Sequence, residues 1–221
     1  EGATLTGEAA VRSSLALGDP APNAFTLATD ALRERLLALP AVADADVRVA
    51  LPGSLAVRVV EREPILAWKH AGRLLLVDAD GLVIADAAAP GAAAAAAAAE
   101  GLPVVDDRRE GDAGPEIGAP VDPLELDVAT RLLSLRPSDV GSAAPELRVI
   151  VRDEDGWTVR PAVEEPWTAV FGFYGPVIRP PTMIPEQVRL LRSLLLDREA
   201  TVLRAILAGE RSGTFTERPE P

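Results

Sequence analysis

The stretch from Leu39 to Asp86 constrains the fold of this chain more than any other part. Apolar side chains alternate with polar or small ones over residues 47–51, and again over residues 55–59 after a Pro-Gly-Ser turn. Side chains of a strand point alternately to its two faces, so this pattern predicts a half-buried β-hairpin. The apolar positions are Val47, Val49, Leu51, Leu55, Val57 and Val59.

Two helices are expected before this hairpin. The first is predicted over residues 8–17 with Thr6 as its N-cap, because apolar side chains recur there at helical spacing. The second is predicted to have Asp30 as its N-cap and to end at Pro40, whose backbone has no donor to continue a helix. Two helices followed by a hairpin predict a small α+β domain.

Pro40 and Val42 precede the hairpin, Pro52 lies in its turn, and Glu61-Arg62, Pro64 and Trp68 follow it. In this order and spacing, these residues resemble the POTRA domain of the FtsQ/DivIB bacterial cell-division family. An acidic turn further on resembles the start of that family's second, β-rich domain. The Glu61-Arg62-Glu63 triplet is also typical of a solvated, ion-paired cluster, with a docking surface near the domain junction as the alternative. The residues that carry the resemblance are Pro40, Val42, Pro52, Glu61, Arg62, Pro64, Trp68, Asp78 and Gly81.

The resemblance implies an α+β fold with a POTRA-like domain of two helices and a small sheet, followed by a β-rich domain with covering helices. We expect the first domain over residues 1–65, the second over residues 66–208, and a C-terminal tail over residues 209–221. Within the second domain, an alanine-rich insertion over residues 87–100 is predicted to be partly helical, and residues 108–123 to form a surface loop.

Further elements are predicted from periodicity and turn signals. Helices are expected from Leu124 to Leu135 and after Pro185, and strands over residues 102–105, 146–152, 156–163, 167–173 and 201–207.

Composition excludes several classes of partner. The net charge of −12 argues against nucleic acid, because phosphate binding needs clustered cations. No window holds about 20 apolar residues free of charge, so no membrane-spanning segment is predicted in the chain. Because family members carry one N-terminal membrane helix, the resemblance implies that this anchor, and the first strand of the POTRA domain, lie outside this sequence.

No catalytic, metal or cofactor site is predicted. His70 is the only histidine, lies at a probable turn where a solvated side chain is typical, and has no recognisable nucleophile motif to serve. Asp78 and Asp80 lack the further oxygen ligands of a calcium loop. The chain has no cysteine, which excludes thiolate chemistry and disulfides.

The resemblance places a partner surface near the C-terminus. In the family, the last helix and the following strand recruit the small coiled-coil proteins FtsB and FtsL, partly by extending the sheet. The predicted partner-binding residues are Thr201, Val202, Leu203, Arg204 and Ile206, with Phe215 as an aromatic anchor on a following extended segment. Alternating side chains in this strand equally fit one face of a packed strand.

The function that follows is a noncatalytic scaffold of the divisome, outside the cytoplasmic membrane at the division septum and tethered by a single-pass helix. It would bind FtsB-like and FtsL-like proteins and other septal membrane proteins, without a small-molecule substrate. The alternative is a POTRA module of an outer-membrane protein translocation system, which would handle extended substrates by strand addition. A cell-wall hydrolase is a third class.

Overall fold

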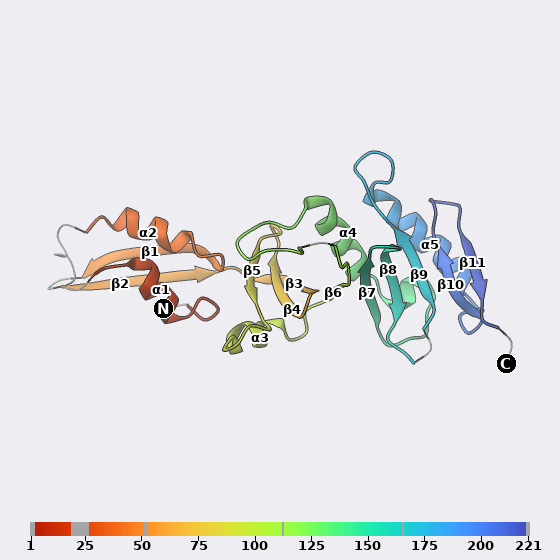
Figure 1. Cartoon of the computed structure of the whole chain (residues 1–221), viewed down its shortest axis with the longest axis horizontal. Helices are drawn as coiled ribbons and strands as arrows, with labels where there is room; N and C mark the ends of the chain where they lie inside the picture. The colour runs from red at the N-terminus through yellow and green to blue at the C-terminus, as the bar shows by residue number, and fades with distance from the viewer. Residues whose placement is uncertain (1–2, 19–26, 51–52, 112, 165, 220–221) are drawn as a thin grey trace. The chain divides into compact units, whose positions relative to one another are not determined.

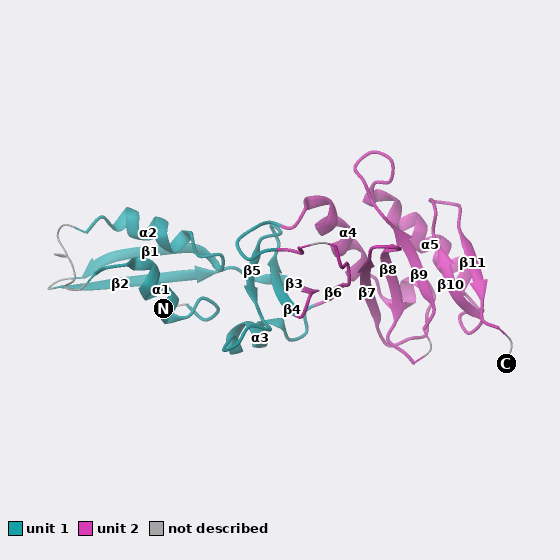
Figure 2. Ribbon diagram, viewed as in Figure 1, with its two compact units in different colours: residues 1–66, 73–102, 116–120 teal, residues 67–72, 103–115, 121–221 magenta. Residues whose placement is uncertain are grey.

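The computed structural model describes residues 3–18, 27–50, 53–111, 113–164 and 166–219. The chain divides into two compact units (Figure 2). Unit 1 holds residues 1–66, 73–102 and 116–120, and unit 2 holds residues 67–72, 103–115 and 121–221. Both units combine helices with strands (Figure 1), which confirms the predicted α+β class.

Unit 1 begins with two helices and the predicted hairpin, which the structure confirms. The elements are α1 (Glu8–Leu15), α2 (Thr29–Leu37), β1 (Val42–Ala50) and β2 (Ser54–Glu61). β1 and β2 pair antiparallel, with Val47 opposite Val57, and form a two-stranded sheet within the described residues. One apolar cluster joins the helices to the hairpin: Val11, Leu15, Leu32, Leu36, Val42, Ala45, Val47 and Val59.

The helix starts differ from the predicted caps. Gly7, not Thr6, is the N-cap of α1, and Ala28, not Asp30, is the N-cap of α2. Neither cap makes a side-chain hydrogen bond. Asp30 lies instead in the first turn of α2, where its charge is favourable to the helix dipole. These helices therefore depend on packing of their apolar faces more than on capping.

The rest of unit 1 is a second hairpin and a short helix. β4 (Arg73–Asp78) and β5 (Val83–Asp86) pair antiparallel. Gly81 connects them with a φ of 84°, a conformation that glycine adopts without strain. The alanine-rich segment forms α3 (Ala93–Ala99), with Ala95 buried.

Unit 2 is built on one sheet, with strands in the order β11-β10-β9-β8-β7-β6-β3. The unit boundary divides β3, which begins at Pro64 in unit 1. Its elements are β3 (Pro64–His70), β6 (Val104–Asp107), α4 (Pro123–Leu133), η2 (Pro137–Val140), β7 (Leu147–Arg152), β8 (Gly156–Pro161), β9 (Thr168–Gly172), η3 (Pro181–Met183), α5 (Ile184–Leu195), β10 (Val202–Ile206) and β11 (Thr214–Glu217). The helices and strands predicted for this region are thus present, and β11 lies in the segment predicted as a tail.

One face of this sheet carries the helices. α4 packs against β6 and β7, and α5 packs against β9. The strand register places Trp68, Val105 and Val149 in one row of this face. The indoles of Trp68 and Trp157 meet edge to face, with ring centroids 5.9 Å apart. This aromatic contact links β3 to β8 across the two strands between them.

The buried leucine of α2 offers a test of the first core. Leu36 is fully buried whereas its neighbour Leu37 is half-buried. Leu36→Ala is expected to lower the free energy of unfolding by about 2–5 kcal/mol, because it removes contacts and leaves a cavity. Urea denaturation measures the change. Leu37→Ala is the matched control, and an equal loss in both variants would contradict this placement of the core.

Candidate partner-binding site

The predicted partner strand is an inner strand of the sheet. β10 pairs in parallel with β9 and antiparallel with β11. The expectation that residues 201–207 offer a free backbone edge is therefore wrong. The terminal strand is β11, and all four of its residues are exposed. A terminal strand presents backbone donors and acceptors along its outer side, so strand addition at this end of the sheet would use β11.

The predicted side chains divide between the core and the surface. Val202 is buried, whereas Leu203, Ile206 and Phe215 are each about two-fifths exposed. Arg204 forms an ion pair with Asp155. The predicted residues therefore combine one core position with an exposed surface that continues onto β11.

Thr201 and Phe215 are held by the segment that precedes β10. The Thr201 hydroxyl donates to the backbone oxygen of Arg198. The Arg198 guanidinium lies over the Phe215 ring, 5.8 Å from its centroid. This cation–π contact fixes the aromatic side chain of the terminal strand while leaving it accessible.

Two polar side chains secure the ends of β9 and β10. The Arg179 guanidinium donates to the backbone oxygens of Phe171, Leu207 and Ala208. The fully buried amide of Gln187 also donates to the Leu207 oxygen, and its own oxygen accepts from the Tyr174 hydroxyl. Sequence reasoning missed these residues, because a single arginine in a loop and a glutamine in a helix carry no motif.

Glu199, in the turn that precedes β10, stabilises the same region. Its carboxylate accepts hydrogen bonds from the Ser142 hydroxyl, the Ala143 amide and the Trp167 indole. Burial acts to raise the pKa of Glu199, but these donors outweigh it and hold the pKa below its ordinary value. The glutamate therefore stays ionised and braces the turn before β10.

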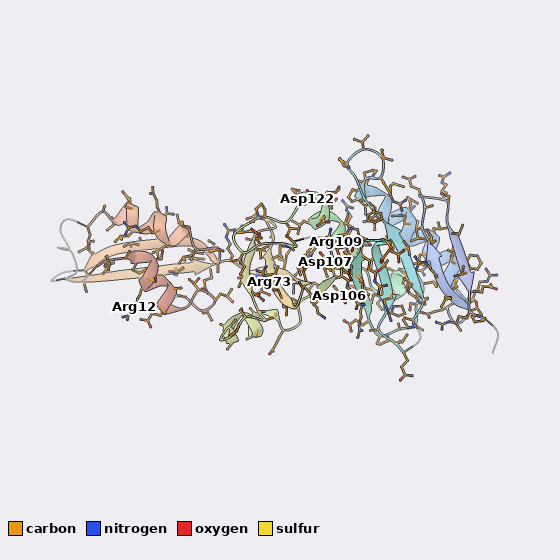
Figure 3. The ribbon with its side chains drawn as sticks, in the orientation of Figure 1. Arg12, Arg73, Asp106, Asp107, Arg109 and Asp122 are labelled. Carbon is orange, nitrogen blue, oxygen red and sulfur yellow. The ribbon has the colours of Figure 1, made fainter. Side chains whose placement is uncertain are left out.

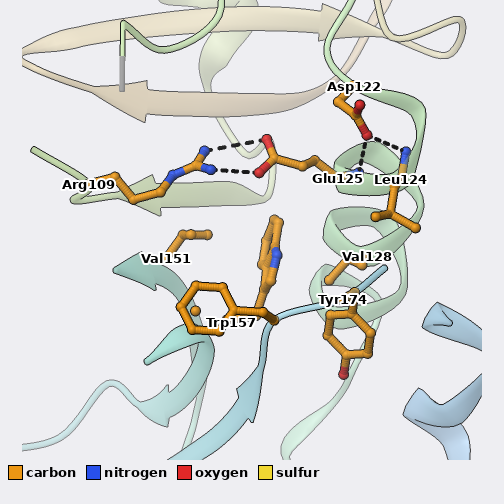
Figure 4. A pocket seen from close by; sticks show the side chains of 10 residues that line it. Arg109, Asp122, Leu124, Glu125, Val128, Val151, Trp157 and Tyr174 are labelled. Atoms are coloured by element: carbon orange, nitrogen blue, oxygen red, sulfur yellow. Dashed lines mark hydrogen bonds and ion pairs between the residues drawn. The ribbon is translucent and has the colours of Figure 1, made fainter. Parts of the chain in front are cut away.

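A second cluster lies where β6 ends. The fully buried carboxylate of Asp107 accepts from the Trp68 indole and from Arg109, which also pairs with Glu125 on α4 (Figure 4). Burial acts to raise the pKa of Asp107, but the hydrogen bonds from Arg109 and Trp68 dominate and lower it. Figure 3 shows Asp106, Asp107 and Arg109 close together.

A pocket of about 410 Å³ lies beside this cluster. Its charged lining comes from Arg109, Glu125 and Asp122, and each of these side chains already makes a hydrogen bond or an ion pair within the protein. Asp122 caps α4 by accepting from the Leu124 and Glu125 amides (Figure 4). The arrangement is therefore typical of an ion-paired network that ties α4 to the sheet.

His70 is not the solvated turn residue that the sequence indicated. It is only 6% exposed, and its Nδ1 lies 3.7 Å from the Asp107 carboxylate without a hydrogen bond. Gly114 packs against the imidazole so closely that a Cβ there would lie 2.4 Å from the ring. The imidazole is thus enclosed by the chain.

The residues that carried the family resemblance make contacts within unit 1. The Glu61 carboxylate accepts from the amides of Thr4, Leu5 and Thr6. Arg62 forms an ion pair of 2.6 Å with Asp78, whose other oxygen accepts from two amides of the turn before β5. These contacts join β2 to the β4–β5 turn and to the segment before α1.

The other motif residues mark the ends of elements. Pro40 follows α2, Val42 starts β1 and is buried, and Pro64 starts β3. Trp68 is in the core of the sheet, and Gly81 is in the β4–β5 turn. Pro52 lies outside the described residues.

Neither a metal-binding cluster nor a membrane-spanning helix is found among the described residues. No group of three or more His, Cys, Asp or Glu side chains could hold a metal ion there. No helix in the same part of the chain is long and apolar enough to cross a membrane.

Residues 1–62 match the family described as "POTRA domain, FtsQ-type". Curated relatives are each named "Cell division protein FtsQ". The one from Cereibacter sphaeroides is 42% identical over 78 residues, which is 35% of this chain and 25% of the relative. The one from Jannaschia sp. is 47% identical over 75 residues, 34% of this chain and 24% of the relative. The one from Paracoccus denitrificans is 37% identical over 81 residues, 37% of this chain and 24% of the relative.

Two helices packed on a hairpin, followed by β-rich structure, define a protein with a POTRA domain at its N-terminal end. Residues 1–62 match the FtsQ-type POTRA domain, and about a third of the chain is similar to curated proteins named for cell division. The matched stretches cover about a quarter of the length of these relatives.

The buried carboxylate of unit 2 makes stability depend on pH. Because folding lowers the pKa of Asp107, its contribution is present above the unfolded value of about 3.9 and is lost as pH falls through the folded pKa. Asp107→Asn is expected to lower the free energy of unfolding by roughly 3–5 kcal/mol at neutral pH, since it removes the buried carboxylate that pairs with Arg109 and accepts from Trp68. Urea midpoints measured from pH 7 down to pH 2 give the change.

The control is Asp127→Asn, which breaks an exposed pair with Arg131 on α4. That pair is expected to be worth only about 0.3–0.5 kcal/mol. A stability gap between Asp107→Asn and the wild type that stays constant down to pH 2 would contradict the role assigned to the Asp107 carboxylate.

Proposed function

We propose that this chain is the extracytoplasmic part of a division scaffold that recruits FtsB-like and FtsL-like proteins at the septum. The FtsQ-type POTRA match over residues 1–62 and the relatives named for cell division support the divisional role. The anchor in this proposal is a single membrane helix outside the sequence. The scaffold acts by placing its partners together, which raises their local concentration, and takes no part in covalent chemistry.

The observation that carries the partner site is the exposed terminal strand β11. A partner segment that adds to β11 in an extended conformation gains backbone hydrogen bonds, and alternate side chains supply selectivity. Phe215 on β11 offers an exposed apolar contact, and Leu203 and Thr201 add contacts on and just before β10. Arg204 and Ile206 flank Ala205, which lies opposite Phe215, so these two side chains would meet a partner from the other face of the sheet. Val202, being buried, would act by holding β10 in the sheet.

The short length and the exposure of β11 fit a strand whose outer side pairs only when a partner binds. It has only four residues, and a short edge strand limits unwanted association. The Arg198–Phe215 contact and the pairing with β10 hold the strand in place before a partner arrives. Binding would then cost little ordering of this chain.

Proline at the terminal strand tests the proposal. Phe215→Pro removes a backbone donor and the aromatic ring from β11 and is expected to weaken partner binding by tenfold or more, which is about 1.4 kcal/mol. The measurement is calorimetric titration of the 221-residue chain with the extracytoplasmic segments of FtsB-like and FtsL-like proteins from the same organism.

The control is Glu210→Pro, which lies between β10 and β11 and outside both strands. It should bind as the wild type does. Undiminished binding by Phe215→Pro would remove the site from β11, and no binding by the folded wild type would favour the translocation module instead.

A further inference from the structure

A cluster of arginines lies on the face of the unit 2 sheet opposite α4. In β7, Arg148, Ile150 and Arg152 alternate with Val149 and Val151. Val151 lines a pocket together with Val128 of α4, so it points toward that helix. Successive strand residues point to opposite faces, and the two arginines therefore point away from α4.

The neighbouring strand adds a third arginine to this face. The register of β7 and β8 sets Arg148 directly opposite Arg160. Arg108, next to the end of β6, pairs with Asp106, and both are close to the same row. Like charges directly opposite each other in a sheet are destabilising. The pairing of Arg148 with Arg160 is therefore a cost that sheet formation does not explain.

Three of these arginines have no partner of opposite charge. The side chains of Arg148, Arg152 and Arg160 make no hydrogen bond or ion pair within the described residues. The Nε atom of Arg160 is buried and unpaired. Burial lowers the pKa of Arg160, and repulsion from Arg108, Arg152 and Arg148 lowers it further. The chain has 34 acidic residues and a negative net charge, so this group of unpaired arginines forms a locally positive surface on an acidic protein.

Exposed apolar side chains beside the arginines favour an acidic polypeptide over a phosphate polymer as the ligand. Val104 and Ile206 have the same strand parity as this row, and each is about two-fifths exposed. The face thus offers apolar contact sites on both sides of the cations. A phosphate polymer has no group to fill such sites, whereas a polypeptide with acidic and aliphatic side chains has both.

The net charge of the chain favours the same choice. A long polyanion, such as nucleic acid or an anionic bilayer, extends beyond the cluster and is repelled by a protein of net charge −12. The screening length at physiological ionic strength is roughly 8 Å, so a short acidic segment can lie wholly within the attraction of the arginines. Guanidinium groups also match carboxylates in bidentate geometry.

We propose that Arg148, Arg152 and Arg160 form a docking surface for an acidic, extended segment of a partner protein whose carboxylates alternate with aliphatic side chains. This surface is on a sheet face and does not use the β11 edge. It shares only Ile206 with the partner site proposed above, and its three arginines belong to neither β10 nor β11, so the inference does not rest on that site. It supplies charge selection, where β11 supplies backbone pairing.

The test is titration of the 221-residue chain with a synthetic peptide of alternating Glu and Val. The matched peptide carries Gln in place of every Glu. The wild type is expected to bind the Glu peptide at least tenfold more tightly, and the preference should shrink as NaCl is raised. Equal affinity for the two peptides would overturn the proposal, as would tighter binding of inorganic phosphate or of phosphatidylglycerol vesicles.

Paired substitutions locate the site. Arg148→Gln/Arg160→Gln should lose the preference for Glu, and its melting temperature should not fall, because a like-charge contact is relieved. Arg58→Gln/Arg211→Gln changes the net charge equally at exposed arginines elsewhere and should keep the preference. Arg148→Lys/Arg160→Lys, which keeps the charge, should retain part of it. Equal loss of the preference in both Gln variants would overturn the assignment.

Discussion

The buried carboxylate of Asp107 is the interaction on which unit 2 depends most. It accepts from the Trp68 indole and from Arg109, and Arg109 in turn reaches Glu125 on α4. A buried charge is costly unless it is paired and hydrogen-bonded, so these partners must stay in place together. One side chain at the end of β6 thereby fixes β3, the following loop and the helix that covers the sheet.

In unit 1, ion pairs and hydrogen bonds to carboxylates also join distant segments, but the side chains involved are less buried. Arg62 pairs with Asp78, and Glu61 accepts three backbone amides from the segment before α1. The triplet that reads as a solvated charge cluster in the sequence thus acts as a connector between segments far apart in the chain. The internal contacts of Glu61 and Arg62 account for the place of these two residues in the family pattern, and the docking alternative stays a prediction.

The two binding surfaces proposed for this chain lie on the sheet of unit 2. The terminal strand β11 offers backbone donors and acceptors along its outer side. The arginine face of the same sheet offers positive charge without an acidic partner. Arg179 and Gln187 keep the ends of β9 and β10 fixed, so that the terminal strand has a rigid support. Under the two proposals, the scaffold would select partners through backbone pairing at β11 and through charge at the arginine face.

The sequence by itself determined the hairpin around residues 47–59, the turn at Gly81, the helices and strands of unit 2 from β6 to β10, and the resemblance to the FtsQ-type POTRA domain, because periodicity and turn chemistry are local. It misplaced the helix caps, and it left β11 in a tail since a strand of four exposed residues has no apolar alternation. Only the tertiary structure decided that β10 is an inner strand, that His70 is enclosed, and that Arg148 faces Arg160. These facts depend on which strands pair and in which register, and pairing between distant segments leaves no trace in the local pattern of either one.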